Sequence, residues 1–138
     1  MDIVHSVQGE RLDTTYTNMR RTKVDRHYYN YAVAGMRRAV EQGTCRGADF
    51  PGVQVCGKTG TAQNRGHDHS AFMGFAPMNN PQIAVCVYVE NGGFGADFAV
   101  PLGSLIMEQF VNGKLSPASE AKANTFQHRH ISYGKQAR

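Results

Sequence analysis

Residues 82–90 constrain the fold more than any other part of the sequence. They read Gln-Ile-Ala-Val-Cys-Val-Tyr-Val-Glu, a short and nearly continuous apolar run. β-Branched and aromatic residues in such a run are typical of a β-strand. Apolar character at almost every position predicts burial on both faces, and therefore a sheet with a layer of structure on each side. The run is also far shorter than the roughly 20 apolar residues that cross a bilayer.

Two further strands are predicted just before this run. Residues 53–57 follow the Pro51-Gly52 breaker, and residues 70–76 end at Pro77. The five-residue linker between the second and third strands, residues 77–81, is short enough for an antiparallel hairpin. The sequence therefore predicts three consecutive strands in a small antiparallel sheet.

A helix is predicted before the strands, over residues 25–43. Asp25 suits the N-cap, Gly43 suits the C-terminal stop, and apolar residues recur between them at the spacing of one helical face. We expect the tyrosines of this stretch to pack in the core and at its rim. We expect the arginines to lie on the solvated flank. These residues are Tyr28, Tyr29, Tyr31, Arg37 and Arg38.

A second helix is predicted after the strands, over residues 100–112, with Pro101 in its first turn and Gly113 at its end. Residues 1–24 are expected to form an extended arm or loose hairpin. Residues 114–138 are polar and show no periodicity, so we expect a disordered tail behind a domain of residues 1–113. This order of elements predicts an α+β fold in which helices cover a small antiparallel sheet.

The formal net charge of +4 resides entirely in that tail. Residues 1–113 contain equal numbers of basic and acidic side chains. The tail opposes Glu120 with five basic residues, Lys114, Lys122, Arg129, Lys135 and Arg138. A basic tail on a neutral body is weak evidence for a nucleic-acid binder, so we expect no nucleic-acid partner.

The cysteines and histidines do not predict a metal site or a disulfide scaffold. The three cysteines Cys45, Cys56 and Cys86 are odd in number and show no Cys-x-x-Cys spacing. His67-Asp68-His69 is interpreted as a surface turn between two strands, because no further ligand cluster is near in the sequence. We therefore expect neither a metal nor another cofactor.

The segment Gly57-Lys58-Thr59-Gly60-Thr61-Ala62 carries the chemistry, and one interpretation is a nucleotide-binding P-loop. Gly52, four further residues and Gly57-Lys58-Thr59 match that pattern letter by letter. The mechanism, however, requires a strand before the first glycine and a helix after the threonine. Loop-like residues 46–51 precede Gly52, and glycine and asparagine soon follow Thr59, so this alternative is the weaker one.

A second interpretation places Lys58-Thr59-Gly60-Thr61 at the end of an edge-like strand that lines a cleft. Side chains two apart on a strand face the same way, so Thr59 and Thr61 can present two hydroxyls side by side. Gly60 has no side chain to hinder a ligand, and Lys58 adds a positive charge. This set of groups suits the carboxylate end of a peptide, and a backbone N–H of the strand can steady a developing oxyanion.

At these residues the sequence resembles the transpeptidase domain of penicillin-binding proteins, over residues 1–113. Four pieces in order carry the resemblance: Lys58-Thr59-Gly60-Thr61, residues 68–77 (Asp-His-Ser-Ala-Phe-Met-Gly-Phe-Ala-Pro), residues 80–85 and residues 90–93 (Glu-Asn-Gly-Gly). The later pieces most resemble penicillin-binding protein 2, the class B enzyme of wall elongation. The resemblance implies the C-terminal portion of the penicillin-binding and serine β-lactamase-like fold, in incomplete form.

The resemblance implies a serine acyl-transfer enzyme that cross-links peptidoglycan through D-Ala-D-Ala stem peptides. It makes Lys58 and Thr61 catalytic, with the Thr61 N–H as an oxyanion donor, and makes Thr59, Gly60 and Thr61 substrate-binding. Stem peptides and β-lactams are the implied ligands, and a glycan polymerase of the elongation machinery is an implied partner. It also implies an inner-membrane anchor and a periplasmic catalytic domain, although this chain shows no signal or anchor of its own.

Two of the family's three motifs are missing from their expected places. No Ser-x-Asn occurs, and Tyr16-Thr-Asn18 and Tyr28-Tyr-Asn30, which mimic a variant of it, lie too near the lysine motif. Ser-x-x-Lys occurs only in the tail, from Ser119 to Lys122 and from Ser132 to Lys135, which we treat as chance. We therefore expect a C-terminal part of a longer transpeptidase that lacks the nucleophile and is inactive alone. A non-catalytic binding module on the same fold remains the alternative.

Overall fold

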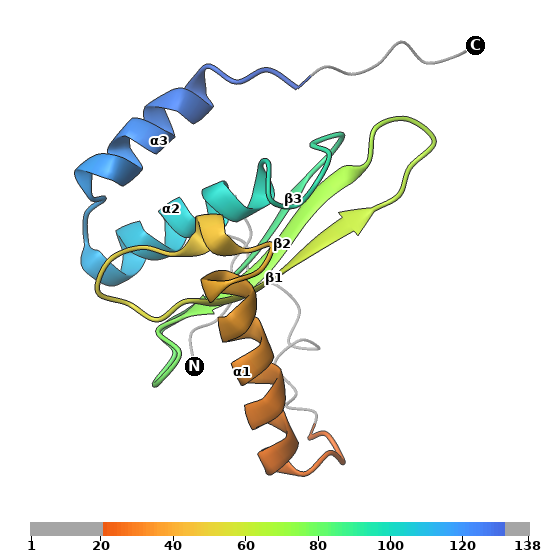
Figure 1. The fold of residues 1–138 in the computed structure, drawn as a ribbon, viewed down its shortest axis with the longest axis vertical. Coiled ribbons are helices and arrows are strands. Elements are labelled where there is room, and N and C mark those ends of the chain that lie inside the picture. Colours follow the sequence, from red (N-terminus) through yellow and green to blue (C-terminus); the bar gives the residue numbers. More distant parts are fainter. Residues whose placement is uncertain (1–20, 132–138) are drawn as a thin grey trace, which may run out of the picture.

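The chain folds into a three-stranded antiparallel sheet with helices before and after it (Figure 1), as described by a computed structural model over residues 21–131. The elements are α1 (Arg26–Glu41), the short 3-10 helix η2 (Arg46–Ala48), β1 (Cys56–Ala62), β2 (His69–Ala76), β3 (Ile83–Val89), α2 (Ala99–Asn112) and α3 (Pro117–Gln127). The predicted α+β class and the three antiparallel strands are confirmed. Most of the predicted arm, the Tyr16-Thr-Asn18 segment and the Ser132–Lys135 segment lie outside the described residues.

The strands follow one another in the sheet in the order β1, β2, β3, so β1 is an edge strand within the described residues. β1 begins at Cys56 and runs to Ala62, three residues later than predicted at its start. The difference arises because Phe50 pairs with Val53 across a tight turn in which Gly52 has a φ of +83°. The lysine motif consequently lies inside β1 rather than at its end.

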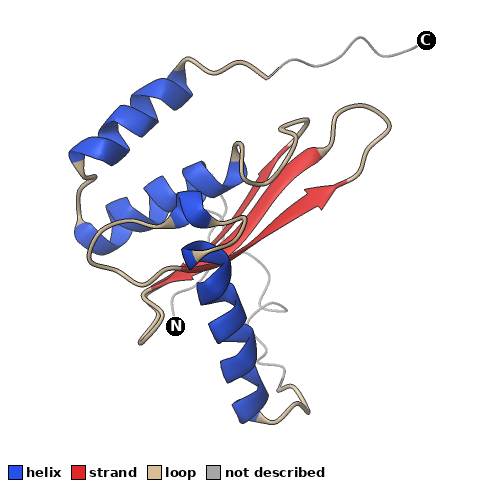
Figure 2. Ribbon diagram, in the orientation of Figure 1, coloured by secondary structure: helices blue, strands red, loops and turns tan. Residues whose placement is uncertain are grey.

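The prediction that β3 is buried on both faces is wrong for the described residues. Exposure alternates along the strand, with Ala84, Cys86 and Tyr88 exposed and the residues between them partly buried. Figure 2 shows α2 lying along one face of the sheet, with α3 beyond α2. The apolar run thus correctly predicts a strand, but it does not predict how many faces of the sheet are covered.

The apolar core lies between α2 and the face of the sheet that α2 covers. Its largest member is the ring of Phe72, which is 1% exposed and comes from the central strand β2. Around it pack side chains from α1, the loop before β1 and α2, among them Val40, Val55, Val100 and Met107. The core therefore joins both predicted helices to one face of the sheet.

The helix α1 forms where predicted, but most of it does not pack. Asp25 is the N-cap, and its Oδ1 accepts a hydrogen bond from the His27 N–H at 3.1 Å. Only Val40, in the last turn, is buried. The predicted core and rim packing of the tyrosines is wrong, because Tyr28, Tyr29 and Tyr31 are 57%, 44% and 75% exposed. Figure 1 shows that α1 meets the rest of the fold through its C-terminal end.

A third helix, α3, occupies part of the segment that was predicted to be a disordered tail. Ser116 caps it by accepting from the Ser119 N–H at 3.4 Å, and Pro117 occupies its first turn. The Lys122 ammonium donates to the Gly47 carbonyl at 3.4 Å, and Arg129 donates to the Asp97 carbonyl at 2.7 Å. Its caps, these long-range contacts and the T-shaped contact of Phe126 with Phe98 hold α3 in place. Across residues 21–131, no helix combines the length and apolar character needed to cross a membrane.

Candidate functional site

The lysine motif lies on the open edge of the sheet, in the middle of β1. Pairing with β2 sets Thr59 opposite Phe72 and Thr61 opposite Ser70, so these two threonines share the face that α2 covers. Lys58 is opposite Met73, on the other face. Lys58 and Thr61 are exposed, and Thr59 is half-buried. The structure thus brings a cation and two alcohols together on one accessible strand edge.

The Lys58 side chain folds back along its own strand. Its Nζ donates a hydrogen bond to the Thr59 carbonyl oxygen at 2.6 Å. An ammonium carries three N–H donors, so this contact leaves two for a ligand or for water. The Lys58 ammonium is therefore held beside Thr59 and can still donate hydrogen bonds to a ligand.

Thr59 makes a contact that sequence reasoning did not anticipate. Its Oγ1 lies 2.8 Å from the Oγ1 of Thr44, which follows α1 and is fifteen residues away in the chain. The next residue, Cys45, is fully buried. Burial raises the pKa of the Cys45 thiol, against the opposing influence of hydrogen bonds from Thr44 and Thr59 and of the Lys58 charge. The thiol is accordingly neutral and lies directly beside the motif.

The loop after β3 packs closely against the motif. A Cβ on Gly95 would lie 2.5 Å from the Ala71 carbonyl oxygen, 2.9 Å from that of Gly60 and 3.0 Å from the Thr59 Cβ. Only glycine permits this approach. The buried Ser70 hydroxyl fixes the loop by donating to the Phe94 carbonyl at 2.9 Å and accepting from the Ala99 N–H at 3.1 Å. The Glu90-Asn-Gly-Gly segment therefore leads into a loop that supports β1, not into a free turn.

The P-loop alternative is overturned by this geometry. A phosphate-binding loop needs backbone N–H groups that curl around the anion and a helix that starts at the threonine. Here Lys58 and Thr59 lie in extended backbone, and β1 continues to Ala62. No helix begins within the described residues between Thr59 and the end of β3.

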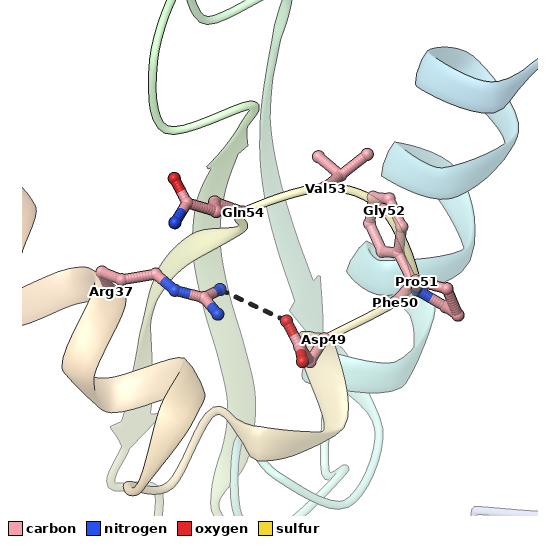
Figure 3. Close-up of a pocket in the computed structure, with 7 residues that line it drawn as sticks. All are labelled: Arg37, Asp49, Phe50, Pro51, Gly52, Val53 and Gln54. Carbon is pink, nitrogen blue, oxygen red and sulfur yellow. Dashed lines mark hydrogen bonds and ion pairs between the residues drawn. The ribbon is translucent and has the colours of Figure 1, made fainter.

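One cavity near β1 is lined by groups that join α1 to the loop before β1. It has a volume of about 400 Å³ and is lined by Arg37 and residues 49–54 (Figure 3). Arg37 was expected on a solvated flank, but its side chain is only 16% exposed. Its donors reach Glu41 at 2.8 Å, Asp49 at 3.2 Å and the Val55 carbonyl at 2.9 Å. The guanidinium is therefore committed to joining α1 to the loop before β1.

The Ser-x-x-Lys sequence that the structure describes does not form a nucleophile. Ser119 and Lys122 lie on α3, which packs on α2 and not on the sheet. Ser119 is 4% exposed, and the Lys122 ammonium contacts Gly47 rather than the serine hydroxyl. Both residues are adjacent to the buried Glu108, whose Oε1 accepts from the Ser116 N–H at 3.0 Å. This arrangement serves to dock α3.

In the segment His67-Asp68-His69, the last residue begins β2 and has a structural role. The Nδ1 of His69 accepts from the Asn91 N–H at 3.0 Å, which ties the start of β2 to the end of β3. Among residues 21–131, no group of three His, Cys, Asp or Glu side chains is placed to hold a metal ion.

Comparison with known proteins identifies relatives of this chain. Residues 1–108 match the family model described as the penicillin binding protein transpeptidase domain. The peptidoglycan D,D-transpeptidase MrdA of Acinetobacter baumannii is 40% identical over 76 aligned residues, in a match that covers 44% of this chain and 11% of that protein. The chain therefore spans about a tenth of the length of this curated relative.

Solved structures agree with this match. Penicillin-binding protein 2 (PBP2) of Pseudomonas aeruginosa, solved in complex with WCK 5153, aligns with a TM-score of 0.59 and 38% identity over 71% of this chain and 23% of that one. A chain of a peptidoglycan synthase complex that coordinates polymerization and crosslinking aligns with a TM-score of 0.60 and 34% identity, over 70% of this chain and 18% of that one. The resemblance found in the sequence, including its likeness to penicillin-binding protein 2, is confirmed.

Proposed function

Because the chain belongs to the family of penicillin-binding protein transpeptidase domains, we propose that it supplies the carboxylate-binding strand of a peptidoglycan D,D-transpeptidase. The observation that carries this proposal is the open edge of β1. There an ammonium and two hydroxyls lie within four consecutive residues, Lys58-Thr59-Gly60-Thr61. No strand covers that edge within the described residues.

The proposed ligand is the C-terminal carboxylate of a D-Ala-D-Ala stem peptide. A carboxylate accepts hydrogen bonds from hydroxyls, and a nearby ammonium makes such an interaction charge-assisted and stronger. Thr59 and Thr61 supply the hydroxyls, Lys58 supplies the charge, and Gly60 leaves room for the peptide to approach. A β-lactam carries a carboxylate in a similar place, so the same groups are proposed to bind it.

The backbone of β1 supports a second role, that of an oxyanion donor. The Thr59 carbonyl accepts from the Lys58 ammonium, and pairing with β2 leaves alternate backbone groups of β1 on its free edge, so we infer that the Thr59 groups face away from β2. Backbone groups two residues apart in an antiparallel strand face the same side. The Thr61 N–H is therefore proposed to point to the open edge, where it can stabilise the negative oxygen of a tetrahedral intermediate.

The proposed reaction is a two-step acyl transfer. A serine oxygen attacks the carbonyl of the penultimate D-Ala, an acyl-enzyme ester forms, and the terminal D-Ala leaves as the amine after gaining a proton. An amine of a second strand then attacks the ester and releases the serine. The sequence has no Ser-x-Asn and has Ser-x-x-Lys only after the lysine motif, so the serine is proposed to lie in a part of the enzyme other than these residues.

The carboxylate site is tested by NMR titration of the 138-residue chain with diacetyl-L-Lys-D-Ala-D-Ala and with its C-terminal amide. We expect the acid to shift β1 resonances with a Kd on the order of 1 mM, and the amide to bind several-fold more weakly. Lys58→Met should abolish the preference for the acid. Lys114→Met removes an exposed lysine elsewhere and should not change it. Equal binding of acid and amide by the unaltered chain would refute the proposed site.

The proposal that the nucleophilic serine lies outside these residues is tested with a fluorescent penicillin. We expect the isolated chain to remain unlabelled, because acylation needs a serine nucleophile that the motif residues do not provide. Covalent labelling that an excess of unlabelled penicillin blocks would contradict this expectation. A non-catalytic binding module, the competing hypothesis, predicts carboxylate binding as well, but no labelling in any longer protein that contains this segment.

The proposed setting is the cell-wall synthesis machinery outside the cytoplasmic membrane. One matched structure belongs to a peptidoglycan synthase complex that couples polymerization to crosslinking. By analogy, the protein is proposed to act with a glycan polymerase. Anchoring to the inner membrane with a periplasmic catalytic domain is proposed on family membership alone.

A further inference from the structure

We propose that Thr44 is a positioning residue, which orients the Thr59 hydroxyl so that its hydrogen points at the carboxylate of the ligand. The inference rests on the proposed function, because it concerns how that same site binds an anion. It begins from the 2.8 Å distance between the Thr44 and Thr59 Oγ1 atoms.

The segment that carries Thr44 is held tightly at the end of α1. The N–H groups of Gly43 and Cys45 both donate to the Ala39 carbonyl, at 3.1 and 3.0 Å. A Cβ on Gly43 would lie 2.9 Å from the Ala39 Cα, so the chain passes too close to the helix for any other residue. Thr44, between these two anchors, therefore has a fixed backbone.

The burial of Cys45 also holds the segment that carries Thr44 in position. It is fully buried in the core cluster beside the Thr44–Thr59 contact, where burial raises the pKa of its thiol and both threonines oppose that rise. The loop after α1 and the strand β1 are thus joined at one point by three neighbouring polar groups. A rearrangement of Thr44 would have to disturb a buried side chain, which is costly in a close-packed core.

Hydroxyl chemistry then decides what the Thr44 contact does. Each hydroxyl has a single hydrogen and two acceptor lone pairs, so only one of the two threonines can donate in their contact. If Thr59 donates to Thr44, it presents lone pairs to an anion. If Thr44 donates to Thr59, the Thr59 hydrogen is free to donate to the carboxylate. An anionic ligand therefore selects the second arrangement, and successive donors in such a chain strengthen one another.

The test compares Thr44→Val and Thr44→Ser in the 138-residue chain, titrated with diacetyl-L-Lys-D-Ala-D-Ala and its C-terminal amide. Valine keeps the shape of threonine and removes the hydroxyl, whereas serine keeps the hydroxyl. We expect Thr44→Val to weaken binding of the acid about fivefold, the size of one hydrogen bond, and to leave binding of the amide unchanged. Thr44→Ser should restore the acid affinity to within about twofold.

If Thr44 had a purely structural role, Thr44→Val would weaken binding of the acid and of the amide together. Equal losses of affinity for the two ligands would therefore overturn the proposal. An acid affinity that Thr44→Val leaves unchanged would overturn it too. In the double variant with Thr59→Val, the Thr44→Val change should have no further effect, because its only route to the ligand is through Thr59.

A measurement on the free chain tests the inference independently of the proposed function. Three-bond scalar couplings should show a single χ1 rotamer for Thr59 in the unaltered chain and in Thr44→Ser, and averaging in Thr44→Val. Averaging in the unaltered chain overturns the positioning role even if a variant fails to fold. If the unaltered chain does not bind the acid, the proposed function fails, and these couplings alone decide whether Thr44 orients Thr59.

Discussion

The ring of Phe72 occupies the space that a side chain on Gly103 would fill. A Cβ on Gly103 would lie 2.5 Å from the Phe72 Cδ1, and Cβ atoms on Gly57 and Gly74 would lie 2.5 and 2.6 Å from the same ring. Glycines on β1, β2 and α2 therefore form the socket for the largest buried side chain. The close approach of α2 to the sheet, and with it the position of the loop that supports β1, depends on this socket.

Gly103→Ala should destabilise the fold, by about 1–3 kcal/mol, since overpacking in a closed core forces side chains and backbone to move. Urea unfolding followed by circular dichroism would measure the change. Gly35→Ala is the matched control, because α1 leaves open space around Gly35. It should stabilise the chain by about 0.5–1 kcal/mol through helix propensity. A neutral Gly103→Ala would mean that α2 can withdraw from the sheet without cost.

Local signals in the sequence predicted the elements well, and contacts between distant residues explain what they missed. Asp25 caps α1 and Pro77 ends β2, because caps and breakers act on their own neighbours. The alternation of exposed and partly buried residues along β3, and the Thr44–Thr59 contact, depend on which elements pack together. No local sequence pattern encodes that packing. The helix α3 was missed because its apolar periodicity is weak. The Ser116-Pro117 cap, read alone, would have revealed it.

Arg37→Met should loosen the connection between α1 and the loop before β1. The guanidinium bonds two carboxylates and the Val55 carbonyl, while its stem is mostly covered. Both carboxylates are partly exposed and regain water, so we expect a loss of about 1–2 kcal/mol in the free energy of unfolding. Arg38→Met, at the exposed neighbour, should change it by less than about 0.5 kcal/mol. Equal effects of the two variants would contradict the bridging role of Arg37.

The docking of α3 should weaken in acid. Burial disfavours the charged form of Glu108, but hydrogen bonds from Ser119 and Ser116 and the charge of Lys122 outweigh it, so its pKa lies below the ordinary 4.5. A carboxylate with a lowered folded-state pKa stabilises the fold above its unfolded-state pKa. This stabilisation is lost as the pH falls through the folded-state value. Carbon chemical shifts of α3 should therefore move toward coil values below about pH 4.5.

Glu108→Gln tests the origin of that acid transition. The amide keeps an acceptor for the Ser116 N–H but has no charge to lose, so α3 should be less helical at pH 7 and insensitive to acid. Glu90→Gln, an exposed carboxylate at the far end of β3, should retain the transition of the unaltered chain. An acid transition that persists in Glu108→Gln would assign the effect to another group.

Exposed apolar side chains of the described residues, on the face of the sheet opposite α2, should make the chain associate. Met73 and Tyr88 are 57% and 55% exposed on the face opposite α2, next to the exposed Ala84 and Cys86; Met73 lies on the central strand and the other three lie on the edge strand β3. Contiguous apolar surface beside open strand edges favours association. Sedimentation velocity should show a mass that rises with concentration, and Met73→Glu with Tyr88→Glu should shift the chain toward monomer. Gln109→Glu, a matched added charge on α2, should not. A monomer at all concentrations would show that this face is tolerated in water.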